Sequence, residues 1–401
     1  MILYIFNNPF PSTGGFSKRC KKEIEILSET NELVIICRAN KKSDEGNYLK
    51  TKYKNIPIYR FKTSIGITDK VLNYKNLAGF YEAIRNLDLL FGLYITLITV
   101  LWKYKQNSIR LYAIVSPLTV PMIAFFSGFL FKVKAEVIEF HDLEPELAMH
   151  IKKLNMNSFV MKVELLLEKI SCLIYKKVIV TSSSQAKRII GRTGIKASKI
   201  FILPNSIQVE TSKHMVNKSQ LLRIGYISSF SYEYNITGLI QLIKYVSKNK
   251  EDFVDIEILV IGEGELLPMA ISETKEWNVD IIFKFIGKQE NISKIMKSID
   301  IGIIPWEKDV MTETILPTKL FEYMQAKKTI IAPNFGEFNH ILSHNEDALL
   351  YNSIKELFLF INTLKLNKNL LDKLATNALI SFKNKYKIEI YRQKLLDFVG
   401  V

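Results

Sequence analysis

The 401-residue sequence has only three cysteines and lacks any basic segment ahead of its apolar start. Cys20, Cys37 and Cys172 are odd in number and lie far apart, so they predict neither a disulfide framework nor a zinc site. A reducing cytoplasm is the compartment that this cysteine usage favours. The opening MILYIFNNPFP does not have the form of a secretory signal. Hydrophobic residues make up 48%, which excludes a disordered or fibrous chain.

Several motifs that define common enzyme classes are also missing. Without an Asp-x-Asp triplet, a metal-bridged nucleotide-sugar site of the single-domain kind is not expected. Without a G-x-x-x-x-G-K-[S/T] loop or a G-x-S-x-G elbow, neither a P-loop ATPase nor an α/β-hydrolase is expected. His340 and His344 have the i,i+4 spacing of helical metal ligands, but no third ligand is nearby. We therefore predict no metal and no other cofactor.

Long uncharged runs raise the question of a membrane span. Residues 111–131 form 21 consecutive uncharged positions, enough to cross a bilayer core of about 30 Å. Pro117 and Pro121 would interrupt a single helix there, so a buried strand, a turn and a buried helix are predicted instead. Residues 89–102 are uncharged but too short to span. The protein is expected to be soluble or peripheral.

The positive charge lies in one half of the chain. The net charge is +15, and residues 1–200 carry 31 Lys and Arg against 16 Asp and Glu, while the rest of the chain is balanced. This asymmetry favours an anionic partner for the first half, either nucleic acid or an anionic membrane surface. A solvated surface without a partner is the alternative. No nucleic-acid-binding module accompanies the charge, so nucleic acid is the less favoured partner.

Short β-branched runs alternate with helical patterns, which is typical of parallel α/β sheets covered by helices. Two doubly wound units of similar size are predicted, with a polar linker over residues 208–221. Strands are expected in the first half at residues 2–6, 32–38, 56–61, 111–115, 135–140, 177–181 and 199–203, and in the second at 223–227, 256–261, 281–286, 302–305 and 329–332. Helices are expected at residues 16–28, 75–102, 157–175, 236–248, 292–298, 317–325 and 353–364.

Four loops carry side chains or glycines suited to chemistry. Gly14 and Gly15, before the first helix, let backbone N–H groups approach an anion, although a plain turn also explains them. His141 and Asp142 follow a strand, where they could orient a hydroxyl or simply cap a helix. Gly262 and Gly264, in Ile-Gly-Glu-Gly-Glu, predict a tight turn.

The segment L-P-T-K-L-F-E-Y-M at residues 316–324 is the most informative. It places a loop at a helix N-terminus, whose free N–H groups suit a diphosphate. Lys319 and Glu322 are three residues apart and can share one face. The alternative is a Lys–Glu pair on a solvated helix surface.

In this order, the segments resemble a family-four retaining glycosyltransferase of the two-domain GT-B fold, as found in bacterial capsule, O-antigen and exopolysaccharide synthesis. Residues 139–146 are similar to the "DLWPE" stretch of that family, and residues 316–332 resemble its "PxKxxEYMA-GKP-VI" segment. The resemblance implies two facing Rossmann-like domains with a cleft between them. It places the acceptor domain at residues 1–207, the donor domain at 222–380, and a C-terminal helix at 381–401 that crosses back to the first domain.

The same resemblance implies metal-independent transfer of a hexose from a nucleotide-sugar, with UDP favoured, to a hydroxyl of a lipid-linked or growing surface glycan. It places the protein in the cytoplasm, on the inner face of the plasma membrane. His141, Asp142 and Lys319 would act at the reacting sugar, beside the loop of Gly14 and Gly15. The donor would be held by a larger set, comprising Ser228, Ser229, Asn235, Gly262, Gly264, Leu316, Pro317, Thr318, Lys319 and Glu322.

The sequence departs from the family pattern at two places. The first Glu of the family's Glu-x7-Glu pair corresponds to Thr314, with Glu313 one residue away. The basic pair that grips the diphosphate is missing from residues 225–235. Two alternatives therefore stay open, a sugar-nucleotide epimerase on the same architecture and a sugar-binding or scaffold subunit without activity.

Overall fold

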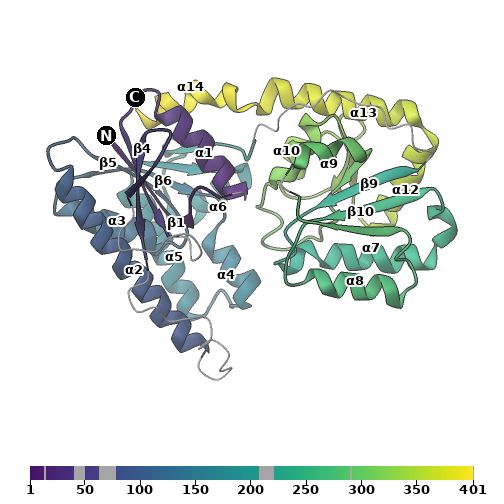
Figure 1. Ribbon diagram of the computed structural model, residues 1–401, viewed down its shortest axis with the longest axis horizontal. Helices are drawn as coiled ribbons and strands as arrows, with labels where there is room; N and C mark the ends of the chain where they lie inside the picture. The colour runs from purple at the N-terminus through teal and green to yellow at the C-terminus, as the bar shows by residue number, and fades with distance from the viewer. Residues whose placement is uncertain (13–14, 40–49, 63–77, 207–220, 290, 401) are drawn as a thin grey trace. The chain divides into compact units, whose positions relative to one another are not determined.

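The computed structural model describes residues 1–12, 15–39, 50–62, 78–206, 221–289 and 291–400, in two compact units (Figure 1). The first unit comprises Met1–Thr181, Gln185–Leu203 and Arg392–Val401. The second comprises Ser182–Ser184 and Pro204–Tyr391. The expected linker lies outside the described residues, apart from Leu221.

The first unit is built on an eight-stranded sheet of order β3-β4-β2-β1-β5-β6-β7-β8. All neighbouring strands are parallel except the pair β3 and β4. Its strands are β1 (Ile2–Pro9), β2 (Leu33–Arg38), β3 (Lys50–Tyr53), β4 (Ile56–Phe61), β5 (Arg110–Ile114), β6 (Lys134–Phe140), β7 (Lys177–Val180) and β8 (Ile200–Ile202). Its helices are α1 (Gly15–Leu27), α2 (Ala78–Lys103), α3 (Thr119–Phe129), α4 (Glu144–Lys152), α5 (Phe159–Ile174), α6 (Ser183–Thr193), the short η2 (Ala197–Lys199) and the end of α14 (Ile388–Val399).

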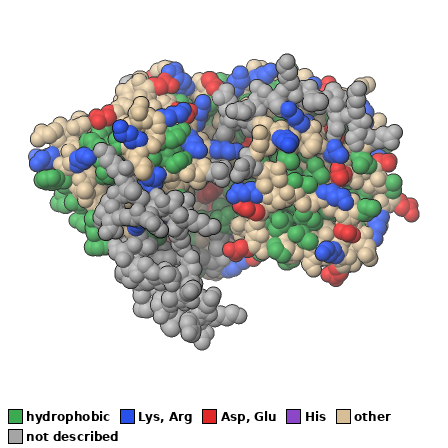
Figure 2. Space-filling model, viewed as in Figure 1, with side chains coloured by type: hydrophobic (Ala, Val, Ile, Leu, Met, Phe, Trp, Pro, Cys, Tyr) green, Lys and Arg blue, Asp and Glu red, His purple; other side chains and the backbone are tan. Residues whose placement is uncertain are grey.

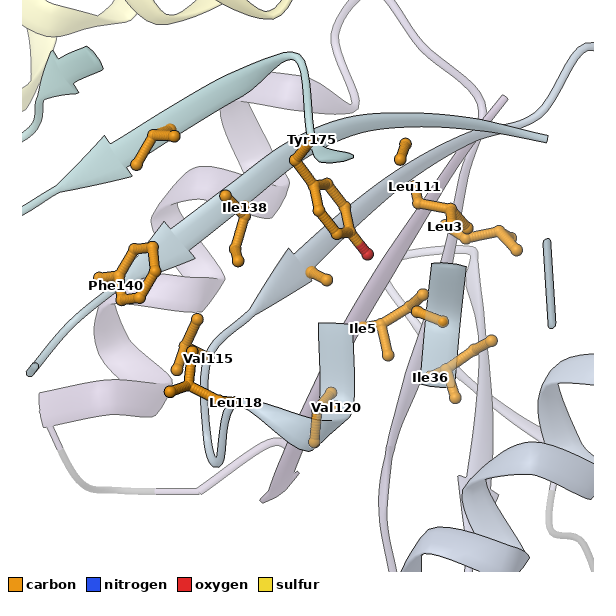
Figure 3. Close-up of a cluster of buried hydrophobic side chains, with 14 of the residues drawn as sticks. Leu3, Ile5, Ile36, Leu111, Val115, Leu118, Val120, Ile138, Phe140 and Tyr175 are labelled. Carbon is orange, nitrogen blue, oxygen red and sulfur yellow. The ribbon is translucent and has the colours of Figure 1, made fainter. Parts of the chain in front are cut away.

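Strand β1 shows why this sheet is buried on both faces. Leu3 and Ile5 belong to the apolar cluster to which α2 and α3 contribute, and Figure 3 shows part of it, with Leu3, Ile5 and Val120 of α3 labelled. Tyr4 and Phe6 point to the opposite face, where Tyr4 bonds to α1 and the Phe6 ring contacts Phe16. Because side chains alternate along a strand, a continuous apolar run is what a doubly covered strand requires.

The uncharged residues 111–131 fold as the sequence predicts. They supply most of β5, a turn that contains Pro117, and α3, whose inner residues Val120 and Ala124 are fully buried. The hydroxyl of Tyr175 donates to the Pro121 carbonyl oxygen at 2.8 Å and ties the start of α3 to the end of α5. Among the described residues, no helix has the length and apolar character needed to cross a membrane.

The second unit has a parallel six-stranded sheet of order β11-β10-β9-β12-β13-β14. Its strands are β9 (Leu222–Ile227), β10 (Ile256–Ile261), β11 (Phe283–Gly287), β12 (Ile301–Ile303), β13 (Thr329–Pro333) and β14 (Leu349–Tyr351). Its helices are η3 (Glu233–Asn235), α7 (Thr237–Lys248), η4 (Lys250–Phe253), α8 (Leu267–Glu276), α9 (Ile292–Ser298), α10 (Thr318–Gln325), α11 (Phe338–Ile341), α12 (Ile354–Leu366), α13 (Lys368–Ser381), the π-helical η5 (Phe382–Tyr386) and the start of α14. The α/β prediction of two parallel sheets is confirmed.

Candidate functional site

His141 lies in the first unit, directly after β6, at the carboxyl end of the sheet. Its ring centroid is 4.9 Å from that of Phe16, which follows Gly15 at the start of α1. The structure therefore places the predicted His141 beside the start of the helix that follows the glycine loop. Gly14 lies outside the described residues, and Gly15 is exposed. Asp142 is exposed and does not cap α4, whose N-cap residue is Leu143.

A buried carboxylate, Glu139, holds the imidazole of His141. The Nε2 atom of His141 is 3.0 Å from Glu139 Oε1. The same oxygen accepts two hydrogen bonds from Arg19, from Nε at 2.9 Å and Nη2 at 2.7 Å, and the hydroxyl of Tyr112 donates to Oε2 at 2.6 Å. With these donors around it, the carboxylate is fixed in position, and it orients the ring of His141.

Two carboxyl groups share the guanidinium of Arg19. Glu23 lies 2.7 Å from Arg19 Nε and accepts a hydrogen bond from the Tyr4 hydroxyl at 2.6 Å. Burial and the neighbouring Glu139 raise the pKa of Glu23 to about 8. Burial also acts to raise the pKa of Glu139, but Arg19 and His141 outweigh it and hold that pKa well below its ordinary value. The pair therefore keeps one charge on Glu139 and a proton on Glu23.

Ligating atoms of Glu23, Glu139 and His141 lie within 4.8 Å of one another, close enough to hold a metal ion. Arg19 already supplies a cation there, because its side chain contacts both carboxylates and also donates from Nη1 to the Leu203 carbonyl oxygen at 2.9 Å. A second cation would be repelled at this distance. The donor set therefore fits a guanidinium rather than a metal. His340 and His344 do not share a helix, since α11 ends at Ile341.

In the second unit, Ser228 and Ser229 follow β9, and Asn235 closes the same loop. The Asn235 side chain is buried and donates from Nδ2 to the Ser229 carbonyl oxygen at 2.7 Å. Its Oδ1 accepts from Trp306 Nε1 at 3.1 Å. Asn235 therefore fixes the fold of this loop, whose Ser228 is half-buried and whose Ser229, Ser231, Tyr232 and Glu233 are exposed.

The two predicted glycines after β10 bring that turn against the loop after β9. Gly262 has φ 144°, and a Cβ there would lie 1.9 Å from the Ser228 carbonyl oxygen. At Gly264, a Cβ would lie 2.2 Å from the Phe230 carbonyl carbon. Backbone hydrogen bonds join Phe230 to Glu263 and Leu266 at 2.9 and 3.0 Å. The glycines thus permit contact between two backbone loops.

Helix α10 carries the charged pair that the sequence singles out. Its N-cap residue, Pro317, has no side-chain capping hydrogen bond, and the preceding Leu316 is buried. Lys319 Nζ lies 2.8 Å from Glu322 Oε2, with the Lys319 side chain 25% exposed and that of Glu322 only 2%. Lys319 and Glu322 therefore share one face as predicted, and they form the ion pair of the alternative interpretation, but the acid of that pair is buried and does not lie on a solvated face. Thr318 opens the first turn and is half-buried.

Several residues that position the candidate site carry no recognisable sequence motif. The Tyr323 hydroxyl donates to the Gly225 carbonyl oxygen at 3.0 Å and accepts from the Ile227 N–H at 3.1 Å, which ties α10 to the end of β9. Arg19 and Glu139 are 120 positions apart in the chain. The sequence feature that could have indicated a buried ion pair is a charged residue within an otherwise apolar strand, as at Glu139.

Comparisons with known proteins agree with the fold. Residues 222–364 match the family model described as "Glycosyl transferases group 1". No curated protein matches the sequence. Anabaena HepE in complex with UDP is similar in structure, with a TM-score of 0.71 and 14% identity over 100% of this chain and 99% of HepE.

Two further solved structures are similar over nearly the whole chain. Sucrose-phosphate synthase from Thermosynechococcus elongatus has a TM-score of 0.73 and 13% identity, covering 99% of this chain and 97% of its own. The lipopolysaccharide outer core galactosyltransferase WaaB has a TM-score of 0.63 and 12% identity, covering 100% and 99%. The chain therefore has the GT-B fold, and its residues 222–364 match the group 1 glycosyltransferase model.

Proposed function

We propose that the protein transfers a hexose from a UDP-sugar to a hydroxyl of a lipid-linked or growing surface glycan, with retained anomeric configuration and without a metal. The observation that carries the proposal is the start of α10. Lys319 and the buried Glu322 lie there on one helix. The Tyr323 hydroxyl joins this helix to the end of β9 by two hydrogen bonds. HepE, which has the same fold, has been solved with UDP and with UDP-glucose.

The local chemistry supports donor binding at α10. The first N–H groups of a helix have no intrahelical acceptors and attract anions, and Pro317 supplies no side chain to satisfy them. A diphosphate placed there would also meet the ammonium of Lys319. The carboxylate of Glu322 is a suitable acceptor for the two hydroxyl groups of a ribose. Ser228 and Ser229 offer further donors beside the end of β9.

For the reaction, we propose that the bond between the anomeric carbon and the diphosphate oxygen breaks first. The acceptor hydroxyl oxygen then forms a bond to the same face of the sugar, and its proton passes to an oxygen of the leaving phosphate. Lys319 and the α10 N-terminus would stabilise the charge that develops on the leaving group. His141, held by Glu139, and Asp142 would orient the reacting hydroxyls.

Calorimetric titration with UDP and GDP tests the donor assignment. UDP is expected to bind, and Glu322→Ala and Lys319→Ala are each expected to weaken binding about tenfold or more, as for lost charge-assisted hydrogen bonds. Lys327→Ala is the matched control, because Lys327 follows the same helix and forms an exposed ion pair with Asp372 at 2.8 Å. Equal weakening by the control, or binding of neither nucleotide, would overturn the proposal.

One observation favours a second candidate, a sugar-binding or scaffold subunit without activity. The loop from Ser228 to Asn235 contains no Lys or Arg, so it brings no cation to a diphosphate.

Incubation with UDP-glucose and an undecaprenyl-diphosphate glycan distinguishes a transferase, a scaffold subunit and an epimerase. Release of UDP that depends on the acceptor supports the transferase, whereas nucleotide binding without any turnover supports the scaffold. Conversion of the sugar without acceptor would indicate an epimerase.

A further inference from the structure

The second half of helix α2 exposes a stripe of apolar side chains. Leu87, Phe91, Tyr94 and Trp102 fall on one face of the helix and are 66%, 56%, 41% and 65% exposed. The opposite side, which includes Leu93 and Leu97, is buried against the sheet. Several large apolar side chains gathered on one exposed helix face are unusual on a surface that contacts only water. The exposed stripe therefore indicates a surface that needs a partner.

The two neighbouring helices continue this surface. Helix α3 contacts both α2 and α5, and Figure 1 shows the three together in the first unit. Phe126 and Phe129 on α3 are 60% and 72% exposed, and α3 contains no charged residue. On α5, Phe159, Leu166 and Leu173 are exposed along one face. Isolated exposed apolar side chains are common, but a stripe on three adjoining helices marks an interaction site.

The charges around these stripes are mostly positive. Lys162 and Lys169 are exposed on α5, and Lys132 and Lys134 follow α3. The ammonium of Lys105 lies 5.0 Å from the Trp102 ring centroid. Glu168, the acid nearest the middle of α5, is buried and paired with Arg192 at 2.8 Å. Figure 2 shows hydrophobic side chains of the first unit reaching the surface among Lys and Arg.

We propose that the outer faces of α2, α3 and α5 dock onto an anionic lipid bilayer, with the apolar side chains in the interface and the lysines on lipid phosphates. Aromatic side chains with neighbouring lysines are the composition that such an interface favours, and the charge is complementary to it. The inference rests on the proposed lipid-linked acceptor, because docking would hold the first unit at the membrane that carries that acceptor.

Vesicle binding without nucleotide tests the surface separately from the donor site. Trp102 is the reporter, and Trp277→Phe removes the other exposed tryptophan, since Trp306 is buried. With phosphatidylglycerol-containing vesicles we expect a blue shift of Trp102 fluorescence and quenching by brominated lipid chains. Binding should weaken at high salt without disappearing, because the apolar contacts are not screened. No shift and no sedimentation with these vesicles would overturn the inference.

Paired substitutions locate the contact. Phe126→Asp with Phe129→Asp is expected to weaken vesicle partition about tenfold or more, since two large apolar side chains leave the interface. Leu366→Asp is the matched control, because Leu366 is 86% exposed in the second unit. Thermal melting checks that each variant stays folded, and UDP titration should be unchanged in all of them. Equal vesicle binding by the double variant and wild type would contradict the proposed surface.

A second copy of this chain is the competing occupant. Light scattering across a range of protein concentrations distinguishes the two. A monomer that binds vesicles supports membrane docking. A dimer that the double variant dissociates would assign the face to self-association and overturn the proposal, whatever the outcome of the nucleotide titration.

Discussion

The guanidinium of Arg19 lies between two buried carboxyl groups, so its single positive charge can neutralise only one carboxylate. Arg19 is 5% exposed, while Glu23 and Glu139 are 1% and 0% exposed. Glu139 has the better hydrogen bonds, from Arg19, Tyr112 and His141, and keeps the negative charge. Glu23 is left to hold a proton. The arrangement makes the stability of the first unit depend on pH.

We predict that stability falls between about pH 5 and about pH 8, and that Glu23→Gln removes much of this fall. The pKa of Glu23 is raised to about 8 from 4.5, so the folded state holds a proton that the unfolded chain releases. This contribution is complete below about pH 4.5 and is lost as the pH rises through about 8, at up to about 1.4 kcal/mol per pH unit. Glutamine mimics the neutral carboxyl at every pH.

Urea unfolding at both ends of this range provides the measurement. Glu25→Gln is the control, because Glu25 lies on the same helix but forms a half-exposed pair with Lys54 that lowers the pKa of Glu25. A wild-type protein whose stability does not change with pH would show that Glu23 stays ionised.

A second prediction at this scale concerns His141. Glu139→Gln replaces the charged acceptor of the imidazole, so turnover should fall roughly tenfold to hundredfold, as expected when a reacting group loses its alignment. The UDP dissociation constant should not change, because Glu139 belongs to the other unit from α10. Steady-state rates and calorimetry measure the two effects. Equal loss of turnover and of UDP binding would mean that the variant acts by unfolding.

At the scale of elements, α10 depends on one side chain for its position. The Tyr323 hydroxyl is buried and bonds to two backbone groups of β9, at Gly225 and Ile227. Because both partners lie inside the sheet, water cannot replace this hydroxyl. The start of α10, with Lys319 and Glu322, is therefore fixed relative to the loop after β9.

We predict that Tyr323→Phe lowers the free energy of unfolding by about 1–3 kcal/mol, since it leaves buried backbone groups unpaired. UDP binding should weaken as well, because α10 loses its tie to β9. Urea unfolding and calorimetry measure both quantities. Tyr245→Phe is the control, as the Tyr245 ring stacks on Phe358 at 3.8 Å and should tolerate loss of its hydroxyl. Normal UDP affinity in the Tyr323 variant would show that α10 is positioned by other contacts.

The sequence predicts the central strands to within a few residues because they are apolar and β-branched, as in β9 and β10. It does not predict β3, whose sequence Lys-Thr-Lys-Tyr is polar and whose only partner is β4 at the sheet edge. The pair of Lys319 and Glu322 was predictable from their spacing. The bonds of Arg19, Asn235 and Tyr323 were not, because each joins residues that only the folded chain brings together.

At the scale of the whole molecule, the last residues complete the first unit. Leu395, Leu396 and Val399 are buried, and the Phe398 ring stacks on Phe201 with centroids 5.2 Å apart. Arg110 donates to the carbonyl oxygens of Val399 and Gly400 at 3.2 and 2.8 Å. Helix α14 starts in the second unit and ends in the first. The predicted boundaries at residues 207, 222 and 380 stay predictions.

We predict that removal of residues 392–401 destabilises the first unit selectively, since each buried apolar side chain contributes about 1.5–3 kcal/mol. Hydrogen exchange measured by mass spectrometry should become faster in β7 and β8 and stay unchanged in β9 and β10. Faster exchange throughout the chain would contradict a selective effect. The variant Lys394→Ala, an exposed change on the same segment, should exchange like the wild type.

The contribution of α14 to the first unit also sets the order of events during synthesis. The strands β1 to β8 leave the ribosome long before α14, whose Phe398 covers Phe201. Until α14 emerges, part of the apolar surface of the first unit stays exposed. The second unit has its sheet complete by Tyr351 and needs nothing from the last ten residues. Although it is translated later, it can finish folding first. A nascent chain that has emerged only as far as Tyr391 would therefore hold every residue of the second unit and an incomplete first one.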